Sequence, residues 1–254
     1  MHLPFSHFGA RLYQDAQLEF AMIKDYYGKY IREVLKLKAS TVDHYLGAIK
    51  AINRILRDNH YHITDMYQAT TKEQLDAIEL FLKNSEEYTG LNTRGNNMYS
   101  AALHNLMRFA SADRFKGYEI FASLDQPVEV HDRSSSLLLT NHRKSIIKNQ
   151  VIHAAHFLCE CDTSHTSFTS LFTSRQFMEG HHLIPLKDQD LFPYSLDIYA
   201  NVVSLCPNCH RLLHLAIKRE KKYYLDRLYE ERQARLLSSG IDISHKEFLQ
   251  LTLR

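Results

Sequence analysis

Apolar side chains recur at three- and four-residue spacings through roughly the first 120 residues, with no alternating strand-like pattern. The clearest run follows Ser40 and Thr41, either of which we expect to cap a helix. Its apolar members are Val42, Tyr45, Leu46, Ile49, Ile52, Ile55 and Leu56. Because these positions share one face of a helix, the pattern predicts an amphipathic helix that packs against others.

Two more helices are predicted further along the same half. One covers residues 75–82 and follows Thr71, a capping residue with Gln74 three positions later. The other runs from Met98 to Phe109. Between them, residues 88–95 contain two glycines and an asparagine, which predicts a turn. We therefore expect a helical domain over residues 1–125.

Two motifs in this half carry a resemblance to a known domain. A Thr-Val-x-x-Tyr-x-x-x-Ile segment begins at Thr41, and a Thr-x-x-x-Leu-x-x-x-x-x-Phe-Leu segment begins at Thr71. Over residues 40–110 the arrangement resembles the helical core-binding domain of phage-type integrases. The resemblance implies that this half grips DNA; the alternative is a helical bundle with a packing or dimerising role.

The chain changes character after residue 125. Pro127 and the serine run at residues 134–136 interrupt the helical pattern, so we expect a linker over residues 126–144 and a second domain over 145–254. That domain is predicted to begin with a helix over residues 145–158. It should end with a charged helix over 218–237, stopped by Gly240, and a short helix capped by Ser244.

The composition is that of a folded globular protein. Of the 254 residues, 44% are hydrophobic and 24% charged, and the formal net charge of +2 neither requires nor forbids a polyanionic partner. No uncharged apolar run reaches the roughly 18 residues needed to cross a membrane. The first five residues lack a basic region and an apolar region, so we expect a cytoplasmic protein rather than a secreted one.

Cysteine and histidine are concentrated in the second half. All four cysteines lie between residues 159 and 209, and five of the sixteen histidines lie between 165 and 214. Cys206-x-x-Cys209 is the spacing at which two thiolates share one tetrahedral zinc ion. His210 and His214 are one helical turn apart, so both imidazoles leave the same face. The pattern indicates metal binding.

The adjacent pair His181-His182 is predicted to lie on a strand rather than on a helix. On a strand, neighbouring side chains point to opposite faces, so the two histidines should have different tasks. A Glu-x-His-His-x-Ile-Pro-Leu block begins at Glu179, and Asn201 precedes His210 by nine positions within a Leu-Cys-Pro-x-Cys-His block. Over residues 159–215 these motifs resemble the HNH, or ββα-metal, nucleases, and the flanking helices to residue 254 fit the HNH proteins of restriction systems.

The resemblance implies an α+β fold that is mostly α. An N-terminal helical domain would precede a zinc-stabilised ββα-metal catalytic domain with C-terminal helices. His182 would be the general base, and His181 and His210, with His214 as third ligand, would hold a catalytic Mg²⁺ or Mn²⁺. Asn201 would tie down the loop between the strands and orient the His182 ring. Glu179 would either hydrogen-bond a metal-binding histidine or face solvent.

A second, structural Zn²⁺ is expected at the cysteines. Cys159, Cys206 and Cys209 would supply three ligands, but the chain lacks the second Cys-x-x-Cys that is usual in the family. The fourth ligand is either Cys161 or His165. In an extended strand the sulfurs of Cys159 and Cys161 would lie about 6–7 Å apart, too far to share zinc without a turn, which favours His165.

These features together predict a metal-dependent HNH DNA endonuclease of a restriction or anti-phage system, acting on double-stranded DNA. Homing or mobile-element nucleases and toxin nucleases are rival enzymes, and a non-catalytic zinc module that binds nucleic acid is the rival of another class. A homodimer would provide two active sites for two strands. Four cations in or after the last motif are expected to contact phosphates: Arg211, Lys218, Lys221 and Lys222.

Overall fold

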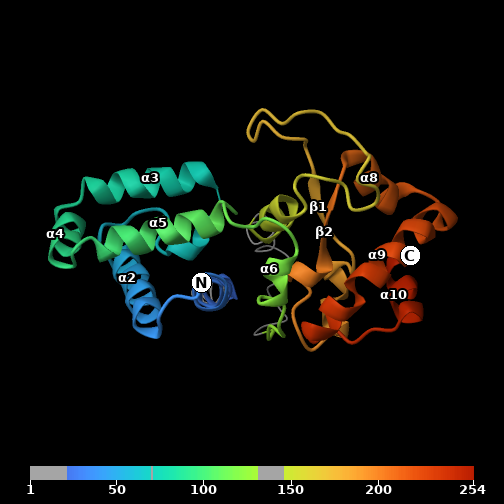
Figure 1. Ribbon diagram of the computed structural model, residues 1–254, viewed down its shortest axis with the longest axis horizontal. Helices are drawn as coiled ribbons and strands as arrows, with labels where there is room; N and C mark the ends of the chain where they lie inside the picture. The colour runs from blue at the N-terminus through green and yellow to red at the C-terminus, as the bar shows by residue number, and fades with distance from the viewer. Residues whose placement is uncertain (1–21, 70, 131–145) are drawn as a thin grey trace, which may run out of the picture. The chain divides into compact units, whose positions relative to one another are not determined.

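The computed structural model describes residues 22–69, 71–130 and 146–254 (Figure 1). These residues form two compact units, with the division between Arg114 and Phe115 and with residues 147–254 in the second unit. Residues 115–130 pack with the second unit. The predicted linker over 126–144 lies for the most part outside the described residues.

The described part of the first unit is helical. Residues 22–29 are helical and continue into a π-helical turn. The named elements are η1 (Tyr30–Val34), α2 (Ala39–Asp58), η2 (Met66–Gln68), α3 (Lys72–Lys83), α4 (Glu86–Arg94) and α5 (Met98–Ala110). Helices α2 and α5 pack together and bury the apolar face predicted for α2, with Ile49 and Ile52 fully inside. Burial of these faces is what holds the short helices together.

The helix boundaries test the predicted capping residues. Thr71 and Gln74 form the predicted capping box at the start of α3, which confirms that expectation. The prediction for α2 was wrong: its N-cap is Lys38, which makes no side-chain cap hydrogen bond, and Ser40 and Thr41 lie inside the helix.

The segment predicted as a turn, residues 88–95, is instead mostly helical and forms α4. Ser85 caps this helix by accepting a hydrogen bond from the Tyr88 N–H, and the Tyr88 side chain is buried. Two glutamates in the first turn and Arg94 in the last turn interact favourably with the helix dipole and so stabilise the helix. Capping and the burial of Tyr88 together outweigh the low helix propensity of Gly90.

The second unit contains a small antiparallel hairpin surrounded by helices, and the described fold is mostly α with this one two-stranded sheet, as predicted. A helix over residues 146–154 comes before the hairpin, shorter than the predicted 145–158. The named elements are α6 (Glu119–Ala122), β1 (Glu179–His182), η3 (Leu186–Leu191), η4 (Tyr199–Asn201), β2 (Val202–Leu205), α8 (Pro207–Leu215), α9 (Lys218–Ser238) and α10 (His245–Thr252).

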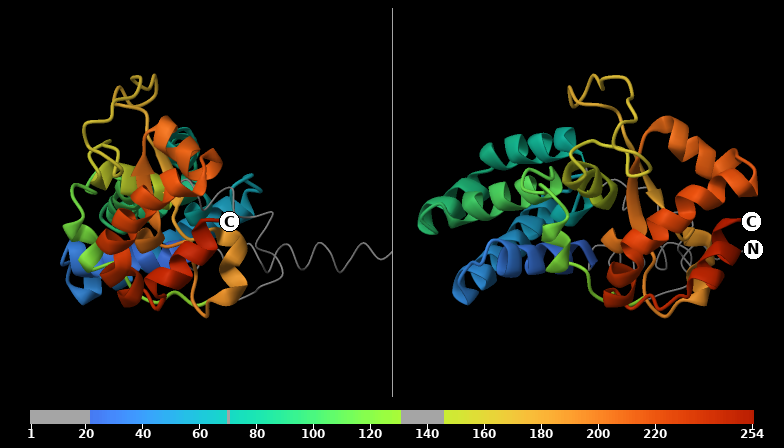
Figure 2. Two further views of the ribbon diagram at one scale, coloured as in Figure 1. Left: turned by 90° about the vertical axis from the view of Figure 1, so that its right-hand side faces the viewer. Right: turned by 45° about the vertical axis from the view of Figure 1, so that its right-hand side comes forward.

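The hairpin and α8 form the ββα arrangement. Glu179 pairs with Leu205 and His182 with Val202, so the two strands are in full register. Helix α8 follows β2 directly and packs against both strands. The segment between residue 155 and β1 is long and irregular, and part of it stands out from the rest of the unit in each view (Figures 1 and 2).

Helix α9 packs against η4 and α8, and α10 packs against α9. Helix α9 ends at Ser238 and Gly240 follows with a φ of +80°, which confirms the predicted stop. Ser244 caps α10 as predicted, in a capping box with Glu247. No helix in the described ranges is long and apolar enough to span a membrane.

Candidate active site and metal centre

The two adjacent histidines of β1 lie on opposite faces of the hairpin. His181 lies against His210 and His214 of α8, with ring centroids 5.1 and 4.8 Å away. His182 is turned away from them, and its Nε2 is 2.7 Å from Oδ1 of Asp197. The alternation of side chains along a strand therefore gives the two imidazoles different surroundings.

The three histidines on the α8 side converge. The rings of His210 and His214 are 4.8 Å apart, and all three rings meet edge to face. One nitrogen from each ring lies within 4.8 Å of the others. Imidazole nitrogens bind zinc at about 2.0–2.1 Å, which places ligands of one ion about 3–4 Å apart. The group therefore fits a single divalent ion with a small adjustment of the side chains.

Electrostatics keeps this group in the form that binds metal. Burial, and after it the neighbouring His210 and His214, lowers the pKa of His181 well below its ordinary value. Burial and then His210 lower the pKa of His214 in the same way. Neutral imidazoles are the species that coordinate metals, so these two side chains are ready to bind at neutral pH.

Glu179 completes this side of the strand. It lies two residues before His181, on the same face of β1, and its Oε2 is 3.0 Å from Nδ1 of His210. Of the two alternatives for Glu179, the structure places its carboxylate beside a histidine of the group, at ion-pair distance. A carboxylate that accepts Nδ1–H leaves Nε2 of His210 for a metal ion, the usual arrangement behind metal-binding histidines.

Asn201 is fully buried and holds the loop between the strands. Its Oδ1 accepts from the Ile184 N–H at 2.8 Å, and its Nδ2 donates to the carbonyls of Ile184 and Leu196 at 2.9 and 2.8 Å. These side-chain hydrogen bonds of Asn201 all go to backbone groups of the loop. Among the described residues, the hydrogen bond to the His182 ring comes from Asp197.

Asp197 was missed because a single aspartate in a loop has no sequence pattern. Its distance from His182 is fifteen residues, and only the closure of the hairpin brings the two together. Lys148, on the helix over residues 146–154, was also missed. Its side-chain carbons lie where a Cβ on Gly180 would be, and its charge contributes to lowering the pKa of His181 and His214. A glycine inside a strand is the one signal of such close approach.

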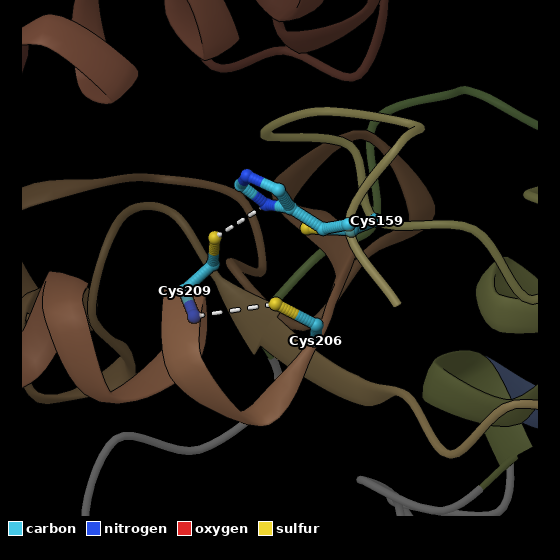
Figure 3. A group of neighbouring side chains, drawn as sticks. Cys159, Cys206 and Cys209 are labelled. Carbon is cyan, nitrogen blue, oxygen red and sulfur yellow. Dashed lines mark hydrogen bonds between the residues drawn. The ribbon is translucent and has the colours of Figure 1, made fainter. Parts of the chain in front are cut away.

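The second group lies at the start of α8. Cys159, His165, Cys206 and Cys209 each offer a ligand atom within 4.8 Å of the others. The Cys209 Sγ is 3.2 Å from Nδ1 of His165, and the Cys209 N–H donates to the Cys206 Sγ at 3.5 Å (Figure 3). Zinc–sulfur bonds of about 2.3 Å place the ligands of a tetrahedral site close to 4 Å apart, so three thiols and one imidazole fit zinc.

Cys161, the alternative fourth ligand, lies beside this group. A hydrogen bond between the thiols of Cys161 and Cys159 is the largest cause that lowers the pKa of Cys159 below the ordinary thiol value. Of the two candidates for the fourth ligand, His165 and Cys161, it is His165 that belongs to the group. Arg227 anchors this segment to α9, because its guanidinium donates to the backbone carbonyls of Glu160 and Cys161.

The four expected phosphate contacts differ in their surroundings. Arg211 and Lys218 are exposed. Lys221 is a correction: it is buried, and its Nζ donates to the carbonyl of His214 at 3.0 Å, where it caps the end of α8. The Nζ of Lys222, although exposed, is 2.6 Å from a carboxylate oxygen of Asp226.

Comparison with known proteins agrees with this geometry. Residues 164–215, which contain the hairpin, the three converging histidines and three of the four ligand candidates of the cysteine group, match the family model of the HNH endonucleases. The chain carries an HNH endonuclease domain. No curated protein and no solved structure matches the chain. The HNH domain assigns a metal-dependent, nuclease-type function with nucleic acid as the substrate, and the cysteine group could hold zinc.

Proposed function

We propose that the protein is a metal-dependent endonuclease that hydrolyses phosphodiester bonds of double-stranded DNA in a restriction or anti-phage system. The observation that carries the proposal is the convergence of His181, His210 and His214. The residue after His181 on the same strand, His182, is paired with the carboxylate of Asp197. The defence role is supported by the resemblance of the flanking helices to HNH proteins of restriction systems.

His182 acts as the general base. Its Nε2 is engaged with Asp197, so Nδ1 is the ring nitrogen that accepts a proton from water. The water oxygen then bonds to phosphorus and the bond from phosphorus to the 3′ oxygen breaks. That oxygen takes a proton from solvent. The products are a 5′ phosphate and a 3′ hydroxyl.

His181, His210 and His214 are the proposed ligands of the catalytic ion, Mg²⁺ or Mn²⁺. When bound, a divalent ion supplies positive charge to the scissile phosphate and to the departing oxygen. The Glu179 carboxylate, 3.0 Å from Nδ1 of His210, would favour a proton on that nitrogen and leave Nε2 for the ion.

The cysteine group has a structural task in this proposal. Cys206 and Cys209 begin α8, the helix that carries His210 and His214. Cys159 and His165 belong to the segment before the hairpin. A zinc ion shared by all four would join that segment to α8 and hold two of the catalytic metal ligands in place.

Substrate contact is assigned to the exposed cations near α8. Arg211 lies on α8 next to His210, and Lys218 begins α9. Both can reach phosphates, which position a duplex without reading its sequence. Target choice would then come from the helical first unit or from a partner. Cutting both strands calls for two active sites, which a homodimer would supply.

The test is incubation of purified protein with plasmid in Mg²⁺, Mn²⁺ or EDTA, using modified and unmodified DNA. We expect nicking or linearisation that needs the ion and is lost in His182→Ala. His245→Ala is the matched control, because His245 pairs with Asp226 on the C-terminal helices. Cleavage that survives EDTA, or that is undiminished in His182→Ala, would contradict the mechanism.

A zinc-containing module that binds nucleic acid without cutting it is the second candidate. It is favoured by one observation: the cysteine group is complete by itself and uses none of the three converging histidines. Tight DNA binding that His182→Ala leaves unchanged, with no cleavage by the unaltered protein in any ion, would support this candidate. The restriction role is tested separately by phage plating on cells that express the protein or the His182→Ala variant.

A further inference from the structure

Asp197 and His182 form a nearly enclosed pair. Their side chains are 5% and 9% exposed, and the carboxylate oxygen and ring nitrogen are 2.7 Å apart. At this distance, and so far removed from water, a negative charge acts on the ring much more strongly than it would at the surface. The pair is therefore more than an incidental surface contact.

The loop that carries Asp197 is fixed from several directions. The Leu196 N–H donates to the Gln189 side chain at 2.8 Å, and the Leu196 carbonyl accepts from Asn201 at 2.8 Å. The Asp197 N–H donates to Oγ of Ser195 at 3.1 Å. The backbone of Leu196 and the N–H of Asp197 are thus held by side chains, so the carboxylate is positioned before any substrate arrives.

We propose that Asp197 is the positioning residue of the general base. It accepts Nε2–H of His182, which holds the ring in one orientation and in the tautomer whose Nδ1 can take a proton. The inference rests on the proposed function, in which His182 is the base.

The same arrangement gives Asn201 an indirect part. Asn201 does not supply the hydrogen bond that orients the ring, but it fixes the carbonyl of the residue immediately before Asp197. Asn201 therefore contributes to the orientation of His182 indirectly, by holding the loop that positions Asp197. An aspartate behind a histidine base serves the same purpose in serine hydrolases, where its replacement by asparagine lowers the rate about 10⁴-fold because the wrong tautomer is held.

A buried aspartate elsewhere in the unit provides a matched control. Asp188 is also buried, and its Oδ1 accepts from Nη1 of Arg254 at 2.9 Å. It belongs to η3, within the same connection between the strands, and pairs with Arg254 rather than with His182. Asp188→Asn thus removes a buried charge from the same loop without touching the base.

The experiment measures single-turnover cleavage of a DNA duplex in saturating Mn²⁺ for Asp197→Asn, Asp197→Glu and Asp188→Asn. We expect Asp197→Asn to cleave about 10²–10⁴-fold more slowly with unchanged DNA affinity and zinc content. Asp197→Glu should recover part of the rate, and Asp188→Asn should stay within about threefold of the unaltered protein. The double variant His182→Ala/Asp197→Asn should be no slower than His182→Ala, because both changes disable one unit.

A second readout needs no cleavage. Nitrogen-15 NMR of the histidine rings, with His182→Gln to assign the signal, reports which nitrogen carries the proton. We expect Nε2–H in the unaltered protein and a changed or mixed tautomer in Asp197→Asn. If the asparagine variant folds poorly, the unaltered protein alone still tests the inference, because an Nδ1–H tautomer there would overturn it.

Three outcomes would overturn the inference. They are a rate for Asp197→Asn within threefold of the unaltered protein, a double variant slower than His182→Ala, or an Nδ1–H tautomer in the unaltered protein. Failure of the proposed function looks different: His182→Ala would then cleave normally, or the unaltered protein would not cleave at all, while the tautomer would still report whether Asp197 sets the ring.

Discussion

Asn201 and Ile184 are joined by a reciprocal pair of hydrogen bonds, from the Ile184 N–H to the Asn201 Oδ1 and from the Asn201 Nδ2 to the Ile184 carbonyl. The Ile184 backbone thus gains a partner like the one a neighbouring strand would offer, just beyond the end of β1. The Asn201 side chain thus continues the pairing of the hairpin beyond its end at His182 and Val202. These two hydrogen bonds also fix the direction in which the chain continues after His182.

Asn201→Ala should destabilise the second unit strongly. The change leaves the buried Ile184 N–H and two carbonyls without their partner, and each unsatisfied buried group costs about 1–3 kcal/mol. We expect a loss of about 3 kcal/mol or more in the free energy of unfolding, measured by denaturant titration. Asn84→Ala, which removes one exposed hydrogen bond to Leu80, should cost less than about 1 kcal/mol. Equal losses for the two variants would contradict this account.

Zinc binding should distinguish the two residues that competed for the fourth position. His165→Ala removes a ligand candidate, whereas Cys161→Ser removes a thiol beside the group. Metal analysis after dialysis should find about one zinc per chain for Cys161→Ser and a 10–100-fold weaker site, or none, for His165→Ala. Cys206→Ser should lose zinc and lower the melting temperature. Retention of zinc by His165→Ala with loss in Cys161→Ser would reverse the assignment.

Gly180 should tolerate no side chain while Lys148 is present. A Cβ there would lie 2.5 Å from Cγ and 2.6 Å from Cβ of Lys148. Gly180→Ala should therefore cost about 1–3 kcal/mol, the usual range for overpacking. Adding Lys148→Ala should restore part of that loss, so the two changes will be non-additive in a thermal-unfolding cycle. Strict additivity would mean that the lysine side chain moves aside freely.

The stability of the first unit should depend on Glu79 and on pH. Hydrogen bonds from Lys83 and then from His104 lower the pKa of the Glu79 carboxyl. Its contribution to stability is present above the ordinary pKa of glutamate and disappears as the pH falls through the lowered value. Glu79→Gln should lose about 0.5–1 kcal/mol at pH 6 and show no difference from the unaltered protein near pH 2. Denaturant titration at both pH values checks this, and a difference that persists in acid would contradict it.

Local patterns predicted the parts of the molecule in which neighbouring residues act together. The capping box of α3 and the facing histidines of α8 depend on spacings of three and four residues, which the sequence displays directly. Helix α4 was not predicted because Gly90 and Gly95 are typical of turns, although Ser85 and the acidic residues after it are typical of a helix start.

In the candidate site, too, features set by neighbouring residues could be predicted and features set by distant residues could not. His181 and His182 could be predicted to face opposite ways from the period of a strand. The partners of these rings could not all be predicted, because Asp197 meets His182 only through a loop whose course depends on buried side chains such as Asn201. The burial of Lys221 was likewise hidden, since a run of cations in the sequence does not reveal which one turns inward.

The two arginines of α9 that reach Glu160 have a practical consequence. Arg227 donates to the Glu160 carbonyl, and Arg232 forms an ion pair with the Glu160 carboxylate. Glu160 precedes the nuclease motif at residues 164–215, and α9, which carries both arginines, follows that motif. The boundaries of the recognisable motif are therefore not the boundaries of a foldable fragment. We expect a truncated gene covering residues 164–215 to yield aggregated product, and a useful minimal version to extend from residue 115 to the last turn of α10.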